Sequence, residues 1–120
     1  NLLEISPGSS NFITINFGEK LYGNVSTLTI DRSLRFDFDY LATYYSNLSY
    51  QPSYVTIVKC IDKLDNLFCL CLNPDDQVRS LYLTEIDKFV LPLVSATLPQ
   101  LLNTFNTLLH LNTEIGYCRF

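Results

Sequence analysis

Cysteine and histidine are the residues whose reactivity would be easiest to recognise in this sequence. The cysteines are Cys60, Cys69, Cys71 and Cys118, and His110 is the one histidine. A zinc site would need Cys-x2-Cys pairs or Cys and His pairs at comparable spacing, and the sequence has neither. A cysteine nucleophile with His110 as its base would need a surrounding motif, which none of the four has. We therefore expect free thiols that pack as small apolar side chains.

A disulfide is the alternative for these cysteines. Cys60 and Cys69 flank a predicted turn between two strands, so a bridge across that hairpin is the first pairing to consider. Such a bridge would indicate an oxidising compartment. Two N-glycosylation tripeptides, which begin at Asn24 and Asn47, fit the same alternative.

Two pairs of carboxylates could bind a cation or act as acid and base. Asp37 and Asp39 lie two residues apart, and Asp75 and Asp76 follow Pro74. No further acidic residues follow Asp76 at the spacing of a calcium loop. The first pair fits the solvated face of a strand and the second pair fits a turn. We expect no catalytic residue, no metal site and no cofactor.

Five tyrosines between residues 40 and 54 form an aromatic-rich segment. A platform for stacking nucleic-acid bases would also need basic neighbours. The eight basic residues are scattered, and 12 acidic residues give a net charge of −4. Because phosphate neutralisation supplies most nucleic-acid affinity, we expect no direct nucleic-acid binding. The tyrosines are predicted to pack in strands and loops, or to form a recognition surface for a protein.

The elements that would position these residues are predicted mainly as strands. Segment 34–40 alternates most clearly, with Leu34, Phe36, Phe38 and Tyr40 on one face and charged residues on the other. A turn is predicted at 62–66. Further strands are predicted at 11–17, 21–30, 54–60 and 67–72.

Helices are predicted in the C-terminal third. Thr84 resembles a helix cap, because acidic residues follow it in the first turn. Pro92 and Pro99 exclude one straight helix, and Pro99 fits the first position of a new one. From there leucines and Phe105 recur at spacings of three and four. The predicted fold class is therefore α+β, a small antiparallel sheet of about five strands packed against C-terminal helices.

The length of 120 residues fits one globular interaction domain that spans 1–120. Apolar residues make up 48% of the chain and charged residues 17%, a balance that predicts a folded protein. The chain begins with Asn1 and has no methionine, so we expect a fragment of a longer protein or a processed chain. The longest uncharged stretch, 89–111, is interrupted by prolines and polar residues, which does not predict a membrane span.

Three segments resemble parts of the RWD-type modules of kinetochore proteins. They are Leu34-Arg35-Phe36-Asp37-Phe38, Tyr54-Val55-Thr56-Ile57-Val58-Lys59 and Leu98-Pro99-Gln100-Leu101-Leu102-Asn103-Thr104-Phe105. Such modules occur in the outer-kinetochore scaffold and in monopolin, and have a small sheet followed by helices. The resemblance implies an RWD-like fold and a nuclear protein of chromosome segregation that docks partners and is not catalytic.

We expect a non-catalytic protein–protein interaction module that binds other protein subunits of a larger complex. The resemblance implies a kinetochore-type assembly and a nuclear or cytoplasmic location. Phe89, Leu93 and Leu111 fall off the main helix stripe and are the candidate partner contacts. The alternative is a secreted or viral glycoprotein domain that binds a receptor or a small ligand.

Overall fold

The computed structural model describes residues 2–119, without the side chains of Leu2, Ile5 and Pro7, and every regular element in that range is helical. The α-helices are α1 Leu2–Ile5, α2 Ser10–Phe17, α3 Glu19–Leu28, α4 Phe38–Ser49, α5 Ser53–Cys69, α6 Asp76–Glu85, α7 Leu91–Thr97 and α8 Leu102–Ile115. Short 3-10 turns cover Pro7–Ser9, Arg32–Leu34, Leu70–Leu72 and Pro99–Leu101, and a π-helical turn, Ile86–Val90, joins α6 to α7. The predicted α+β fold is wrong, since the RWD-like sheet has no counterpart within residues 2–119.

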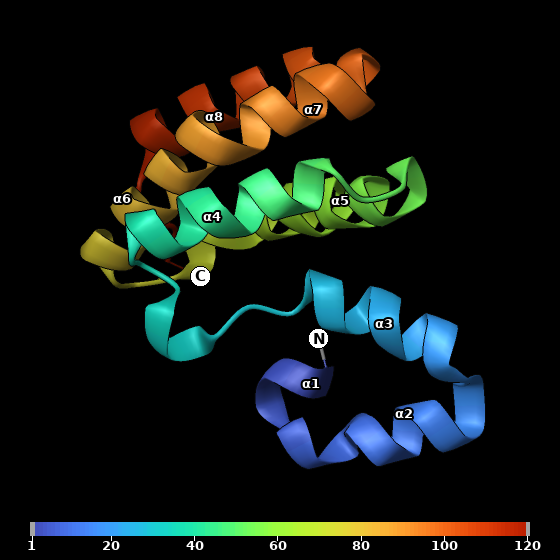
Figure 1. Ribbon diagram of the computed structural model, residues 1–120. Helices are drawn as coiled ribbons and strands as arrows, with labels where there is room; N and C mark the ends of the chain where they lie inside the picture. Colours follow the sequence, from blue (N-terminus) through green and yellow to red (C-terminus); the bar gives the residue numbers. More distant parts are fainter. Residues whose placement is uncertain (1, 120) are drawn as a thin grey trace.

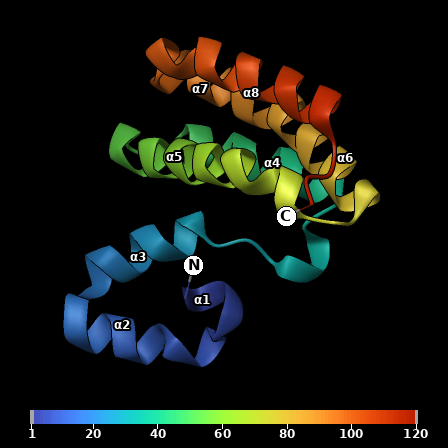
Figure 2. The same ribbon diagram turned by 180° about the vertical axis from the view of Figure 1, so that it is seen from behind.

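The helices form three layers (Figure 1). Helices α4 and α5 lie in the middle, with α7 and α8 on one side and α1, α2 and α3 on the other, and α6 lies across one end of the middle layer (Figure 1). The view from behind shows the same order (Figure 2). The main core lies between the middle layer and the C-terminal layer. It contains Leu41, Tyr45, Leu48, Val55, Cys60, Leu67, Leu70, Ile86, Val90, Leu93, Val94 and Phe105.

Helix α4 begins where the clearest strand was predicted. The Asp37 side chain accepts hydrogen bonds from the backbone N–H groups of Asp39, at 3.0 Å, and Tyr40, at 3.1 Å. These donors have no partner within the helix, so an aspartate at this position stabilises the helix start. Segment 34–40 is therefore a 3-10 turn, a cap and the first turn of α4, and its alternation does not reflect a strand.

Helix α5 covers the predicted strand 54–60 and the predicted turn 62–66. Its buried residues recur every three or four positions and are Val55, Thr56, Lys59, Cys60, Lys63 and Leu67. Two of these buried residues are lysines. If lysines are assumed to lie on the surface, the three- and four-residue spacing of the buried face cannot be recognised in the sequence. Cys60 and Cys69 lie nine residues apart on this helix, a rise of about 13 Å, so the predicted bridge between them cannot form.

The C-terminal helices are partly as predicted. Pro99 begins the 3-10 turn that leads into α8, and Phe105 is fully buried, but it packs against helices and not against a sheet. The predicted cap Thr84 lies near the end of α6 instead, where its hydroxyl donates to the Ser80 carbonyl. Asp75 is the residue that caps α6, through the N–H groups of Gln77 and Val78.

Segments 11–17 and 21–30, both predicted as strands, form most of α2 and α3. Gly18 alone connects these two helices, and its φ of 88° lies in the left-handed region that a side chain disfavours. The apolar and β-branched residues of 11–17 do not form the buried face of a strand. They lie on one short helix, on which Phe12, Ile15 and Phe17 are all more than half exposed.

Candidate functional site

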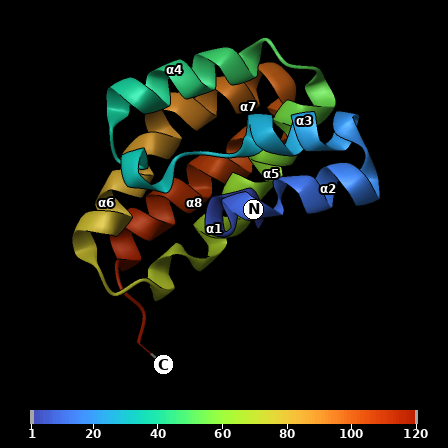
Figure 3. The same ribbon diagram turned by 60° about the horizontal axis from the view of Figure 1, so that its bottom comes forward.

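A cleft of about 830 Å³ lies between the N-terminal layer and the helices α5 and α6. With the N-terminal layer turned forward, α3 crosses α5 (Figure 3). The wall formed by α2 and α3 is apolar and comes from Ile13, Phe17, Leu21, Val25 and Leu28. The opposite wall is mixed: it includes the polar residues Lys59, Asp62, Lys63, Asn66 and Glu85 and apolar ones such as Val58, Leu70 and Val78.

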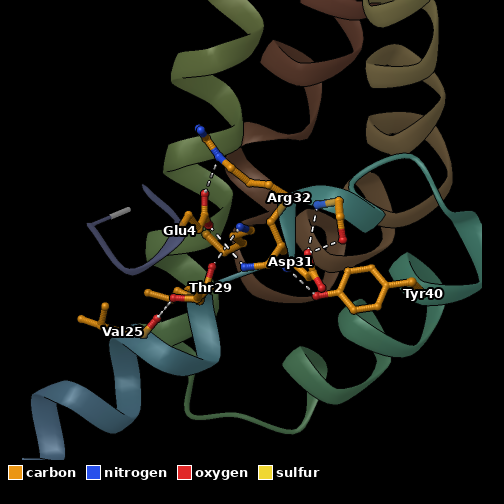
Figure 4. Close-up of polar contacts among 10 residues, drawn as sticks. Glu4, Val25, Thr29, Asp31, Arg32 and Tyr40 are labelled. Carbon is orange, nitrogen blue, oxygen red and sulfur yellow. Dashed lines mark hydrogen bonds and ion pairs between the residues drawn. The ribbon is translucent and has the colours of Figure 1, made fainter. Parts of the chain in front are cut away.

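The segment between α3 and α4 also lines the cleft and is held by α1 and α4 (Figure 4). Glu4 accepts a hydrogen bond from the Ile30 N–H at 3.3 Å and lies 3.9 Å from Arg32. The Asp31 N–H donates to the Tyr40 hydroxyl at 2.8 Å. Hydrogen bonds from the Ser33 side chain and backbone hold the pKa of Asp31 below its usual value. The polar groups here bind one another and fix the course of the chain.

A buried ion pair occupies the mixed wall. Lys63 Nζ lies 2.7 Å from Glu85 Oε2, and both side chains are less than a tenth exposed. The Tyr45 hydroxyl donates to the same carboxylate oxygen at 3.2 Å. Burial, followed by the Glu85 charge, raises the pKa of Tyr45 above its usual value. The network joins α4, α5 and α6 across the core.

Lys59 is the second buried cation of this wall and is 5% exposed. Its ammonium donates to the Leu28 carbonyl at 3.3 Å and lies 5.3 Å from the centre of the Tyr44 ring. Within the described part of the chain it makes no ion pair with a carboxylate. Burial, followed by the charge of Lys63, lowers the pKa of Lys59. Because the ammonium is directed at the end of α3, Lys59 attaches α3 to α5, and nothing around it forms a proton-transfer pair.

The outer face of α5 carries the most regular apolar surface of the protein. Five large side chains, which we call the α5 stripe, are each between 46% and 58% exposed; four lie on this face, and Leu72 lies in the 3-10 turn that follows α5. They are Tyr54, Val58, Ile61, Phe68 and Leu72. Their spacing is that of a heptad seam in which residue 65 is the one polar position. At about 100° per residue the stripe lies opposite the buried face of α5.

Helix α8 also carries exposed apolar side chains near α5. The Asn112 side-chain amide donates to the Leu67 carbonyl at 3.1 Å, which places the end of α8 beside the second half of α5. On the same part of α8, Leu111 and Ile115 are 42% and 55% exposed.

Two aspartates are the charged groups of the stripe. Asp65 occupies its polar heptad position, and Asp62 lies at the edge of the stripe, where it also lines the cleft; both are exposed. Neither makes an ion pair with a lysine or arginine in the range that the structure covers. The two lysines of α5 point into the protein. The stripe is therefore apolar with an acidic centre.

The three predicted partner contacts are dispersed. Leu111 is exposed on α8, but Leu93 is buried in the core. Phe89 stacks on Tyr45 with ring centres 5.7 Å apart, and it packs edge-on against Phe38. The sequence did contain the signal for the α5 stripe, in residues 54, 58, 61, 68 and 72, but a turn predicted at 62–66 interrupted it.

The other candidate residues form no site for catalysis. Asp37 and Asp75 are helix caps, and His110 is exposed on α8. Cys60 is buried, which raises the pKa of its thiol to about 11. Among residues 2–119, no group of three or more Cys, His, Asp and Glu side chains is placed to hold a metal ion. Within the same range no helix has the length and apolar character to cross a membrane.

Comparison with known proteins gives no relationship for this chain, since no family model, no curated protein and no solved structure matches it.

Proposed function

We propose that this protein is a non-catalytic interaction module whose α5 stripe binds an amphipathic helix of another protein. The observation that carries the proposal is the heptad spacing of five half-exposed apolar side chains, four of them on the face of α5 opposite its buried face. Contiguous apolar patches on soluble domains usually bind partners. A row at three- and four-residue spacing is complementary to the apolar face of another helix.

The charges on the stripe specify the partner further. Asp65 would lie at the centre of such an interface without a counter-charge, and Asp62 would lie at its edge. A partner helix with a lysine or arginine at its central position would neutralise them, and complementary charge also fixes the register of the two helices. In a second copy of this chain, Asp65 would instead face another aspartate or an apolar side chain, which is unfavourable. The proposed partner is therefore a different protein with a basic amphipathic helix.

The RWD resemblance does not support this proposal, because that resemblance implied a sheet and the described residues contain none. The support comes from α5 itself. No role in a kinetochore assembly is needed for it.

The proposal is tested with two helical peptides of about three heptads that carry leucine at the a and d positions. One has lysine at its central a position and the other has glutamate there. We expect the lysine peptide to bind at least about tenfold more tightly, a difference of about 1.4 kcal/mol or more. Isothermal titration calorimetry measures both affinities, and Asp65→Lys should reverse the preference.

Matched variants locate the binding surface. Ile61→Asp and Phe68→Asp should abolish binding while circular dichroism shows an intact fold, because both side chains are about half exposed. Ile15→Asp, on α2, is the control, since Ile15 is 82% exposed and far outside the stripe. Binding that survives both stripe variants would contradict the proposal. A concentration-dependent dimer that Ile61→Asp dissociates would show that the occupant is a second copy.

A further inference from the structure

The chain after α8 returns to the end of α5 (Figure 2). Helix α8 ends at Gly116, whose φ of 67° lies in the left-handed region and allows the chain to reverse. Two residues later the Cys118 N–H donates to the Cys71 carbonyl at 2.8 Å. Tyr117 lies against Arg79 of α6, with the guanidinium 5.6 Å from the ring centre. The tail is therefore held at the turn that follows α5.

The backbone contact between Cys71 and Cys118 brings the two residues close together. One backbone N–H···O=C bond of normal length places the two Cα atoms roughly 5–6.5 Å apart. Disulfides form at Cα separations of about 4.4–6.8 Å. The neighbouring Cys118 thiol also acts on the Cys71 thiol, whose pKa it raises. The two cysteines are therefore placed for a disulfide without a large movement of the chain.

The other two cysteines lack this arrangement. Cys60 is buried in the core, and Cys69 is exposed on α5. Cys71 and Cys118 are both partly exposed, so a small reagent can reach them. All four are free thiols in this structure.

We propose that Cys71 and Cys118 are a site of reversible oxidation, at which a small disulfide such as oxidised glutathione produces an intramolecular disulfide. The thiolate of one cysteine attacks a sulfur of glutathione disulfide, which forms a mixed disulfide and releases one glutathione thiolate. The thiolate of the other cysteine then attacks the protein sulfur of the mixed disulfide and releases the second glutathione. The two protein thiols lose two protons and two electrons, and one glutathione disulfide is reduced to two glutathiones.

The bond would close a loop that contains α6, α7 and α8. It would hold the tail at the turn Leu70–Leu72, independently of whether the α5 stripe binds a partner. Burial, together with the neighbouring Cys118 thiol, raises the pKa of Cys71, and Arg79 opposes this. Because the thiolate is the attacking species, oxidation should become faster as the pH rises from neutrality.

The test equilibrates the folded protein with graded ratios of oxidised to reduced glutathione, blocks remaining thiols with an alkylating reagent, and measures intact mass and peptide maps. We expect the oxidised protein to lose two of its four reactive thiols, with a peptide that links Cys71 to Cys118 and no retained glutathione. The oxidised form should also unfold at a higher temperature than the reduced form, because the closed loop restricts the unfolded chain.

Single variants provide the controls. Cys71→Ser and Cys118→Ser should each leave the remaining cysteine as a stable mixed disulfide with glutathione, whereas Cys69→Ser should leave the internal bond unchanged. The same equilibration in denaturant should reduce the preference for this pair, because the fold supplies it. Glutathione retained on both cysteines of the parent protein, or linked peptides that contain Cys60 or Cys69, would overturn the proposal.

Discussion

Lys63 and Glu85 place opposite charges inside the protein, 2.7 Å apart and both nearly inaccessible to water. Removing two charges from water is costly, and the attraction between them offsets that cost only while both are present. The Tyr45 hydroxyl satisfies the carboxylate further, and the Tyr82 hydroxyl donates to the Lys63 carbonyl at 3.4 Å. The pair therefore makes the arrangement of α4, α5 and α6 sensitive to any change that leaves one charge alone.

Glu85→Leu and Lys63→Met should each reduce the free energy of unfolding by about 3–5 kcal/mol, because each leaves a buried charge unpaired. The double variant should lose much less than the sum of the two, since neither member of the pair is left as an unpaired buried charge. Urea denaturation of the three proteins measures this coupling. The control is Asp76→Ala, which breaks the pair of an exposed aspartate with Arg79 and should cost about 1 kcal/mol or less. If the destabilisations of the two single variants simply add in the double variant, Lys63 and Glu85 do not stabilise the protein as a pair.

Lys59 should affect stability in a pH-dependent way. The pKa of Lys59 is lowered in the folded protein. At pH values between this lowered pKa and about 10.5, the unfolded chain therefore binds a proton at Lys59 that the folded protein does not. The cost of burying the charged ammonium disfavours folding most at pH values below the pKa of Lys59 in the folded protein. It disappears at pH values above the pKa in the unfolded chain. The stability of Lys59→Met relative to the parent protein should therefore be highest near pH 7 and decrease as the pH rises toward 10. Parallel urea titrations give the difference, and a constant difference would show that the pKa is not lowered.

Phe105 should be essential to the core, because its side chain is fully buried between α8 and the other helices. Phe105→Ala should reduce the free energy of unfolding by about 3–5 kcal/mol, which combines lost burial with a residual cavity. Asn106→Ala, at the next and exposed position, should cost less than about 0.5 kcal/mol. Thermal and chemical unfolding of both variants compare the two sides of α8. Equal stability would show that this face of α8 is not core.

At the scale of elements, the sequence predicts the C-terminal helices better than the rest. Pro99 and the leucine spacing after it specify a helix directly, because both signals act locally. Segment 34–40 does alternate, but the run is short, and its last three residues form the first turn of α4. Segment 54–60 is rich in β-branched residues and forms part of α5. The outcome depends on Asp37 as a cap and on buried lysines in α5, whose burial only the packed structure provides.

The cap of α4 gives a direct test of helix against strand. Asp37→Ala should reduce stability by about 0.5–2 kcal/mol, because it removes the acceptor for two N–H groups at the helix start. Asp37→Asn keeps an acceptor and should change stability by only a few tenths of a kcal/mol. Denaturant midpoints of the two variants measure the difference. Equal effects of alanine and asparagine would show that the side chain does not act as a cap.

At the scale of the whole molecule, the candidate site depends on an arrangement that composition does not specify. The heptad positions of the α5 stripe are visible in the sequence, but their exposure follows from how three layers stack. The same spacing would be core if α2 and α3 covered it. Likewise, the contact between Cys71 and Cys118 joins residues far apart in the chain, and it depends on the reversal at Gly116.

The limited contact between the N-terminal layer and the rest of the protein has a kinetic consequence. Helices α1, α2 and α3 pack mainly on one another, and α3 provides their contact with α5. The main core lies within α4–α8, whereas the N-terminal layer contacts it mainly through α3, so we expect α4–α8 to fold before the N-terminal layer docks onto it. Leu28→Ala, which removes contacts between α3 and the core, should then speed unfolding and leave the refolding rate nearly unchanged. Stopped-flow mixing measures both rates. A refolding rate that falls in proportion to stability would place α3 in the folding nucleus instead.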